Sequence, residues 1–318
     1  MRDGYLTGEP SSIPIALFGC LSMTEPVRSP RRSSGGWASE CDGLTRLADV
    51  TSYAPNWIEL EGVVNIRDVG GLPTADGRRI RSGVLIRSAN LSSVTEADVA
   101  RLVNELRVRR VLDLRTDVEV RNSEPGLLRG TDGVTFHNLS LYPDGKSEAE
   151  AELEAQAEAE ANPDPVAPWA GEHYPEGRDP QVVSYLRYLE RRPDSIVAAL
   201  RAIAEPDGAT VVHCAAGKDR TGMVIALALS VAGVPPELIA ADYAESQSQM
   251  IAIIRQLADI DLYELSVDEP DKIPPTTAET MLGVLECIEA DHGGVLAWLA
   301  EHGWTDQDTE RLRATLID

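Results

Sequence analysis

The sequence has little positive charge and very few lysines. It contains 29 basic and 52 acidic residues, for a formal net charge of −23, and its only lysines are Lys146, Lys218 and Lys272. A chain with this charge repels polyanions before contact, which argues against nucleic acid as a partner and against stable membrane association. Any phosphate-binding site must therefore be built locally, and a lysine inside a motif is informative.

Cysteines and long apolar runs are also scarce. Cys20, Cys41, Cys214 and Cys287 are widely spaced and include no Cys-x-x-Cys pair, so we expect free thiols in a reducing compartment, with no metal site and no cofactor. No apolar run approaches the ~20 residues that a membrane-spanning helix needs. These absences favour a cytoplasmic location.

The composition changes along the chain. Residues 1–55 are rich in Ser, Pro and Gly without a sustained apolar period, which predicts a disordered N-terminal extension. Residues 56–318 contain the apolar segments, and 43% hydrophobic residues in the chain suffice for a core. Within this part, residues 146–165 form an acidic, low-complexity stretch with almost no apolar face, which we expect to be a mobile insertion.

Apolar periodicity gives the expected elements. Strands are predicted at residues 63–67, 84–87, 110–115, 134–139 and 209–213, and helices at 96–106, capped by Thr95, and at 181–189, 194–204 and 221–231. From Pro236 onward we expect four or five helical segments and no strand. Strands that alternate with helices, followed by a helical run, predict an α/β fold with a mainly parallel sheet and helices on both faces.

The predicted strand at 209–213 leads into the sequence His-Cys-Ala-Ala-Gly-Lys-Asp-Arg-Thr-Gly, residues 213–222. A Cys-x5-Arg spacing is weak evidence by itself, but this one lies between a predicted strand and a predicted helix. Substrate-binding groups are then expected from Ala215, Ala216, Gly217, Lys218 and Thr221, because the backbone N–H groups of the loop and the amino end of the helix converge on one point. Such a loop suits a phosphate group.

The side chains of the loop suit a reaction at that phosphate. The positive end of the helix dipole and the Arg220 guanidinium favour the thiolate form of Cys214 at neutral pH, and a thiolate is a nucleophile. The planar fork of Arg220 can hold two phosphoryl oxygens as charge spreads over them in the transition state. Thr221 can donate its hydroxyl to the Cys214 sulfur, which would steady the thiolate as a leaving group. These roles predict a phosphocysteine intermediate, which water then hydrolyses.

Other interpretations of the loop are weaker. Cys214 could be an ordinary buried thiol at a strand end, but the Gly-Lys-Asp-Arg-Thr-Gly run would then have no explanation. A nucleotide-binding loop of the Walker type needs a glycine five residues before Gly217, where the chain has Val212. We expect His213 to support the loop rather than to transfer protons.

The loop closely resembles the signature of the atypical, or triple-specificity, group of bacterial tyrosine phosphatases related to mycobacterial tyrosine phosphatase B. Three further segments fit the same family in the same order, namely Asn-Ile-Arg-Asp-Val-Gly-Gly at residues 65–71, Asp-Leu-Arg at 113–115 and Tyr-Pro-Asp at 142–144. The resemblance covers residues 57–316. Ile66 stands where the family usually has an aromatic residue, which is a conservative departure, and the acidic insertion is not typical of the family.

The resemblance implies a phosphatase-type α/β catalytic domain over residues 56–318, with residues 237–275 as the candidates for a helical lid. It implies a protein-tyrosine phosphatase that acts on phosphotyrosine-containing proteins, with dual specificity or phosphoinositide substrates as a further expectation. Export without a recognisable signal also occurs in the family. A non-catalytic phosphate-binding module on the same fold stays as the alternative function, and an arsenate-reductase-like or rhodanese-like thiol enzyme as a weaker one.

Two aspartates compete for the role of the acid that protonates the leaving group. Asp219 lies inside the loop, and the resemblance favours it because members of the group use the loop aspartate. Asp144 occupies the position of the acid in other dual-specificity phosphatases, although Tyr-Pro-Asp-Gly is also an ordinary turn sequence. We therefore predict Asp219 as the acid. Lys218 would add a positive charge that a second anionic group of a phosphoinositide could bind, or it is a surface lysine paired with an acid.

Overall fold

The structure is a computed structural model, and it describes residues 53–143, 179–258 and 273–318. The chain divides into two units, residues 1–42 and 43–318, and every described residue lies in the second. The acidic insertion, Asp144, nearly all of the predicted N-terminal extension and residues 259–272 of the predicted lid lie outside the described residues. Their predicted character stays a prediction.

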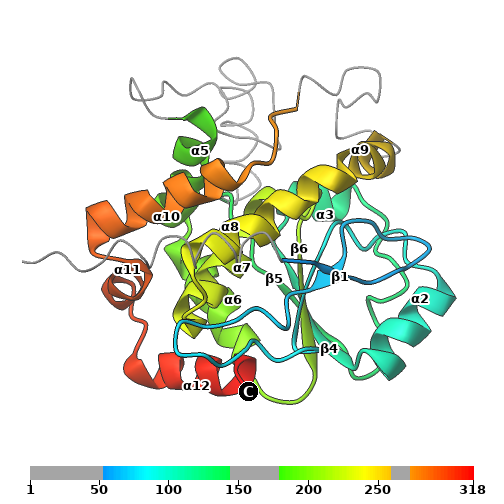
Figure 1. The fold of residues 1–318 in the computed structure, drawn as a ribbon. Coiled ribbons are helices and arrows are strands. Elements are labelled where there is room, and N and C mark those ends of the chain that lie inside the picture. The colour runs from blue at the N-terminus through cyan, green and yellow to red at the C-terminus, as the bar shows by residue number, and fades with distance from the viewer. Residues whose placement is uncertain (1–52, 144–178, 259–272) are drawn as a thin grey trace, which may run out of the picture. The chain divides into compact units, whose positions relative to one another are not determined.

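A six-stranded sheet forms the centre of the second unit (Figure 1). Its strands are β1 (Asn56–Trp57), β2 (Arg67–Asp68), β3 (Leu85–Ser88), β4 (Val108–Asp113), β5 (Thr135–Asn138) and β6 (Ala209–His213), in the spatial order β1-β2-β3-β6-β4-β5. β3, β6, β4 and β5 pair in parallel, whereas β1, β2 and β3 pair antiparallel. The mainly parallel sheet predicted from the sequence is confirmed.

Helices lie on both faces of this sheet, as predicted (Figure 1). The described helices are α2 (Glu96–Ala100), the π-helical turn η1 (Arg101–Glu105), α3 (Asp117–Arg121), α5 (Pro180–Arg191), α6 (Pro193–Ile203), α7 (Asp219–Ala232), α8 (Pro236–Ala244), the 3-10 turn η2 (Glu245–Gln249), α9 (Met250–Ala258), α10 (Ala278–His292), α11 (Val295–Glu301) and α12 (Asp306–Leu316). The run from α8 to α12 agrees with the helical C-terminal part expected from the sequence.

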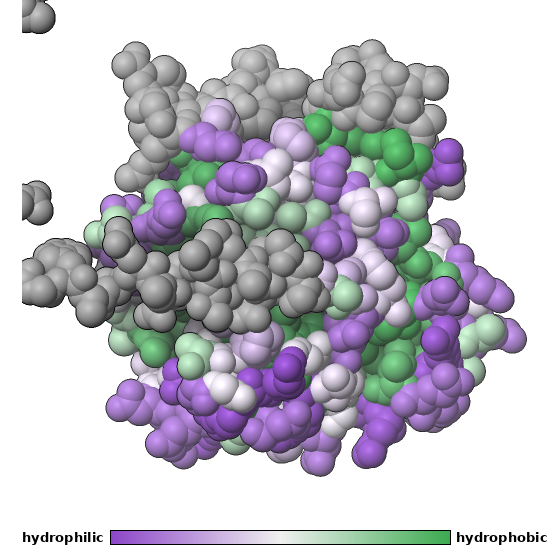
Figure 2. Space-filling model, in the orientation of Figure 1, coloured by the Kyte–Doolittle hydropathy of each residue, from purple (hydrophilic) through white to green (hydrophobic). Residues whose placement is uncertain are grey.

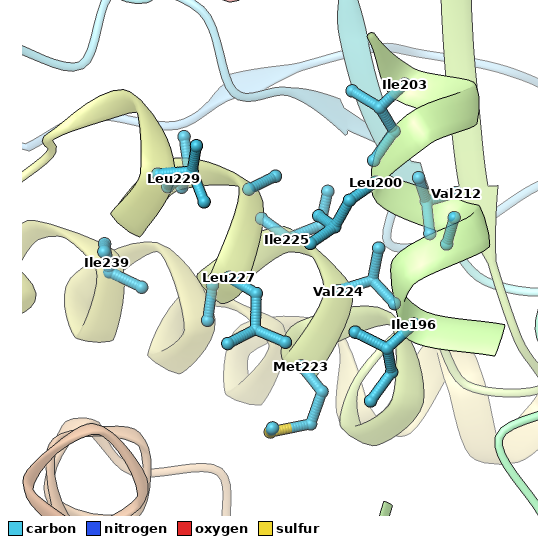
Figure 3. Close-up of a cluster of buried hydrophobic side chains, with 14 of the residues drawn as sticks. Ile196, Leu200, Ile203, Val212, Met223, Val224, Ile225, Leu227, Leu229 and Ile239 are labelled. Atoms are coloured by element: carbon cyan, nitrogen blue, oxygen red, sulfur yellow. The ribbon is translucent and has the colours of Figure 1, made fainter. Parts of the chain in front are cut away.

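The strands divide their side chains between two cores, because successive residues of a strand point to opposite faces. In β6, Val211 packs with Leu102 of η1 on one face, and Val212 packs with the helices of the other face. Figure 3 shows this second core, where Val212 meets Leu200 of α6 and Val224 of α7. Burying each such side chain contributes roughly 1.5–3 kcal/mol. Twelve of the 14 residues of α7 are buried, so the amino end of this helix is held firmly beside the carboxyl end of β6.

Two predicted elements differ in the structure. The strand expected at 63–67 is wrong: pairing begins only at Arg67, because Asn65 takes a φ of +51°, outside the range of a strand. The helix expected at 96–106 begins at the predicted Thr95 cap, where the side chains of Thr95 and Asp98 cap each other's backbone. It then widens into a π-turn, closed by Leu106 N–H donating to the Arg101 carbonyl at 3.0 Å.

The described part of the predicted lid covers one side of the loop at residues 214–218. Ile253 and Leu257 of α9 pack against Ala215, with Ala216 at the edge of the same cluster. The outer side of α9 exposes Ile251, and apolar side chains gather at this helix in the upper right of Figure 2. No helix within the described ranges is both long enough and apolar enough to cross a membrane.

Candidate active site

Residues 214–218 form a tight loop between β6 and α7. Gly217 has a φ of +67°, and a Cβ atom at this position would lie 2.3 Å from the Ser88 carbonyl oxygen. Only glycine combines this backbone conformation with so close an approach. The loop therefore passes directly over the carboxyl end of β3.

Side chains and backbone from distant segments hold the peptide groups of this loop from behind. Three consecutive carbonyls accept hydrogen bonds: Ala215 from the Asn90 backbone N–H at 2.9 Å, Ala216 from Asn65 Nδ2 at 2.9 Å, and Gly217 from an Arg87 guanidinium nitrogen at 2.9 Å. The C=O and N–H of a trans peptide point in opposite directions. The N–H groups of Ala216, Gly217 and Lys218 therefore point to the other side of the loop, as an anion-binding cradle requires.

Cys214 stands at the start of the loop and Arg220 in the first turn of α7. Cys214 is 2% exposed. The first backbone N–H groups of α7 have no partner within the helix, so their partial positive charge lies near Cys214. Cys214 and Cys287, the cysteines within the described ranges, are free thiols. In the same ranges no group of three or more His, Cys, Asp or Glu side chains is placed to hold a metal ion.

Glu119 of α3 fixes the direction of Arg220. Its two carboxylate oxygens accept hydrogen bonds from the two terminal nitrogens of Arg220 at 2.6 and 2.8 Å, and both side chains are buried. Burial alone would lower the pKa of Arg220, but Glu119 outweighs it and raises the pKa well above the ordinary value. The Tyr142 ring lies 4.8 Å from the guanidinium carbon. Arg220 therefore stays charged. Its Nη1 also donates to the Leu114 carbonyl at 3.4 Å, so its Nε–H and one Nη2 hydrogen remain as the donors for a phosphoryl group.

Glu119 is a site residue that the sequence did not identify. Its signal was present as the capping-box pattern Thr116-x-x-Glu119, which marks the start of a helix. The structure confirms that pattern, since Glu119 accepts from the Thr116 N–H at 2.8 Å and Thr116 accepts from the Glu119 N–H at 3.1 Å. One carboxylate thus caps α3 and holds Arg220.

Asp219 lies at the first position of α7 with its side chain 35% exposed. Tyr185 of α5 donates a hydrogen bond to Asp219 Oδ1, and the Tyr185 and Tyr243 hydroxyl oxygens are 2.6 Å apart. Burial, reinforced by Asp219, raises the pKa of Tyr185 well above its ordinary value, so this hydroxyl remains a donor. The hydrogen bond from Tyr185 therefore holds one carboxylate oxygen of Asp219, the predicted acid, in place.

Lys218 is buried, which neither interpretation of this residue anticipated. It is 4% exposed, and its Nζ donates to the Pro274 carbonyl at 3.1 Å and lies 3.5 Å from Asp219 Oδ1. It is therefore paired with an acid, as one alternative expected, but not at the surface. The positive charge of Lys218 therefore lies next to Asp219, the predicted acid.

Two further residues of the signature are enclosed. Burial lowers the pKa of His213 to about 4, with the nearby Asp113 carboxylate only partly opposing it, so His213 is neutral at pH 7. Its Nδ1 lies 3.3 Å from the Cys214 carbonyl oxygen, which supports a structural role. Thr221 is fully buried, and its hydroxyl makes no hydrogen bond to any described residue. The hydrogen bond expected from Thr221 to the Cys214 sulfur is therefore not formed in this conformation.

Several known phosphatases are similar to this chain. The model of the tyrosine phosphatase family matches residues 58–318. A triple specificity protein phosphatase, PtpB, of Mycobacterium tuberculosis is 28% identical over 285 residues, which cover 81% of this chain and 98% of that protein. A tyrosine-protein phosphatase of Nostoc commune is 27% identical over 250 residues, which cover 77% of this chain and 78% of that protein.

Proposed function

The chain belongs to the tyrosine phosphatase family, and on this basis we propose that it hydrolyses phosphotyrosine residues of proteins through a phosphocysteine intermediate on Cys214. The observation that carries the proposal is the loop itself. Its carbonyls are held from behind, its N–H groups face the opposite side, and Arg220 is fixed beside it by Glu119. These groups together suit a phosphate dianion next to a buried thiol.

In the first step the Cys214 thiolate attacks the phosphorus atom. A sulfur–phosphorus bond forms as the bond between phosphorus and the tyrosine oxygen breaks. The loop N–H groups and Arg220 stabilise the charge on the three phosphoryl oxygens that do not leave. Asp219 gives its proton to the departing oxygen, so that tyrosine leaves as a neutral phenol.

In the second step water attacks the phosphorus atom of phosphocysteine. Asp219, now a carboxylate, accepts a proton from this water, and the sulfur–phosphorus bond breaks. Inorganic phosphate leaves, and Cys214 returns to the thiolate. The same aspartate therefore serves as acid and then as base, and the enzyme ends the cycle as it began.

Exposure and hydrogen bonding support Asp219 as the acid. Its partly exposed side chain can be reached by a substrate, and the bond from Tyr185 to Oδ1 leaves Oδ2 to carry the proton. Asp144 lies outside the described residues, so mutation must compare the two. The Asp219→Asn variant should lose about 10²- to 10⁴-fold in kcat on a phosphotyrosine peptide. The loss should be smaller on p-nitrophenyl phosphate, whose leaving group needs less protonation, and Asp144→Asn should change little. The reverse pattern would assign the acid to Asp144.

We extend the proposal to phosphoserine, phosphothreonine and phosphoinositide substrates, because the Mycobacterium tuberculosis relative is a triple specificity phosphatase. Lys218 would meet a second phosphate only by sharing its Nζ with the Pro274 carbonyl and Asp219. If it does, Lys218→Met should lower kcat/KM for a phosphoinositide more than for a phosphotyrosine peptide. Equal losses on both substrates would limit Lys218 to supporting the loop.

Hydrolysis of p-nitrophenyl phosphate tests the reaction itself. The unmodified protein should release p-nitrophenol, and Cys214→Ser should show none above background, because serine lacks the thiolate nucleophile. Binding of tungstate, a phosphate analogue that is not turned over, is measured on the same samples. Tungstate binding without turnover by the unmodified protein would favour the alternative, a non-catalytic phosphate-binding module.

A further inference from the structure

The block at residues 65–71 contains two residues that the proposed reaction does not use, Asn65 and Arg67. Asn65 is 1% exposed, and its Nδ2 donates to the Ala216 carbonyl while its Oδ1 accepts from Arg67 at 2.7 Å. Its φ of +51° lies in the left-handed region, which asparagine enters more readily than most residues. Position 65 therefore needs a residue that accepts a left-handed backbone conformation and that carries an amide side chain, as asparagine does.

Arg67 and Arg87 share one carboxylate, Asp242 of α8. Arg67 Nε donates to Asp242 Oδ1 at 2.9 Å, and Arg87 donates to Oδ2 at 2.5 Å. A second nitrogen of Arg87 donates to the Gly217 carbonyl of the loop. We call Asn65, Arg67, Arg87 and Asp242 the Asp242 cluster; its members bond to two consecutive carbonyls of the loop and to each other.

The Asp242 cluster is fully enclosed and carries a net positive charge. None of its four residues is more than 1% exposed. Burial alone would raise the pKa of Asp242, but Arg67 and Arg87 outweigh it and hold the pKa at about 2, so the carboxylate is ionised. Two guanidinium groups then face one carboxylate directly behind the loop. Apolar side chains of similar volume often stabilise a fold as well as buried ions do, so stability alone is a poor reason for this arrangement.

The buried ions of the Asp242 cluster are better explained by their effect on the orientation of the loop. A peptide group can flip if its carbonyl has no partner, and a flip at Ala216 or Gly217 would turn the N–H of Gly217 or Lys218 away from the phosphate. Asn65 and Arg87 prevent both flips, and Arg67 and Asp242 hold those two side chains in place. The uncompensated positive charge behind the loop also favours a dianion in front of it.

We propose that the four residues of the Asp242 cluster are positioning residues, which hold the loop at residues 214–218 in its phosphate-binding conformation. This inference rests on the proposed function, since it assigns a role in binding the phosphate of the substrate. It concerns binding rather than chemistry, so it can be tested with an anion that is not hydrolysed.

Asn65→Asp is the sharpest substitution, because it changes no volume and replaces one donor by an acceptor. The new carboxylate keeps an oxygen toward Arg67 and places the other against the Ala216 carbonyl, where two acceptors repel. We expect tungstate to bind about 10- to 100-fold more weakly, the change that an unsatisfied buried acceptor produces. The kcat/KM for p-nitrophenyl phosphate should fall by a similar factor. Arg87→Lys, which keeps the charge but cannot bond to Asp242 and Gly217 together, should act in the same direction.

Arg110→Lys is the matched control. Arg110 is a buried arginine that bonds to Thr210 and to the Glu205 carbonyl, at the end of β6 away from the loop. Its replacement should lower stability without changing tungstate affinity. Measurements are made well below the unfolding temperature of each variant, with circular dichroism as the check of folding.

Wild-type tungstate affinity in both folded variants of the Asp242 cluster would overturn the inference, and so would equal weakening in Arg110→Lys. If Asn65→Asp does not fold, Arg87→Lys decides by the same measurement. A different result would show that the proposed function is wrong: the unmodified protein would bind tungstate but would not hydrolyse p-nitrophenyl phosphate. In that case the effect of the substitutions on tungstate binding would still decide the role of the cluster.

Discussion

Replacing Glu119 by glutamine should remove the charge that balances Arg220 while keeping the size of the side chain. Glu119 is fully buried and the Arg220 side chain is 5% exposed, so water cannot take over the lost interaction. Geometry adds to the effect. One carboxylate oxygen accepts from Thr116 N–H and Arg220, and the other accepts from the second terminal nitrogen of Arg220. An amide has one oxygen, so in either orientation its NH₂ group faces a donor.

The expected loss in unfolding free energy is about 3–5 kcal/mol, the typical cost of leaving one member of a buried ion pair without its partner. Domains have unfolding free energies of about 5–15 kcal/mol, so the variant should still fold but with a much smaller unfolding free energy. Its kcat should fall about 10²-fold, because Arg220 is no longer held at the phosphoryl group. Tungstate should stabilise the variant more than the unmodified protein, since the bound anion supplies the missing negative charge.

Urea unfolding followed by tryptophan fluorescence measures these effects, because Trp298 and Trp304 are buried in the core. Asp117→Asn is the control: it neutralises another acid in the first turn of α3, at an exposed position, and should cost no more than about 1 kcal/mol. A Glu119→Gln variant within about 1 kcal/mol of the unmodified protein would refute the reasoning. Equal stabilisation of both proteins by tungstate would also refute it.

Three further outcomes are expected. Tyr185→Phe removes the donor that fixes Asp219 Oδ1, so kcat on a phosphotyrosine peptide should fall about 10-fold; Tyr188→Phe, whose hydroxyl faces Tyr142 instead, should leave kcat unchanged. Burial holds the pKa of His213 at about 4 in the folded protein, against about 6.5 in the unfolded chain. The unfolded chain therefore binds its proton first, and urea unfolding should show about 3 kcal/mol of stability lost as pH falls from 6.5 to 4, a slope that His213→Gln should lack. Gly217→Ala should abolish tungstate binding in a folded protein, because the new methyl group meets the Ser88 carbonyl.

The loop and its flanking elements could be predicted from the sequence because their signals are local. The expected strand at 209–213 coincides with β6, and α7 begins two residues before the predicted start at Thr221. The partners of the loop lack such signals. Glu119 lies 101 residues before Arg220, and Asp242 lies 155 residues after Arg87. No pattern within a short window joins residues this far apart, and a capping glutamate does not reveal a second, buried partner.

The prediction of a strand at 63–67 was wrong because of another long-range contact. Val63 and Ile66 are apolar and buried, as in a strand, but they enter the core from a chain that bends at Asn65. The bend allows the Asn65 amide to reach Ala216, 151 residues away. Here a long-range contact outweighs the local preference of the neighbouring β-branched residues.

The distance along the chain between the loop and its supports also bears on what a fragment of this protein can do. A piece that spans residues 179–318 would contain Cys214 and Arg220, yet it would lack Asn65, Arg87 and Glu119. Its loop could form only by chance among many conformations, so the fragment should be inert toward phosphate. The missing partners all lie within residues 53–143, so the site requires both parts of the chain. The piece with residues 179–318 therefore carries the ten-residue signature without the distant side chains that orient it.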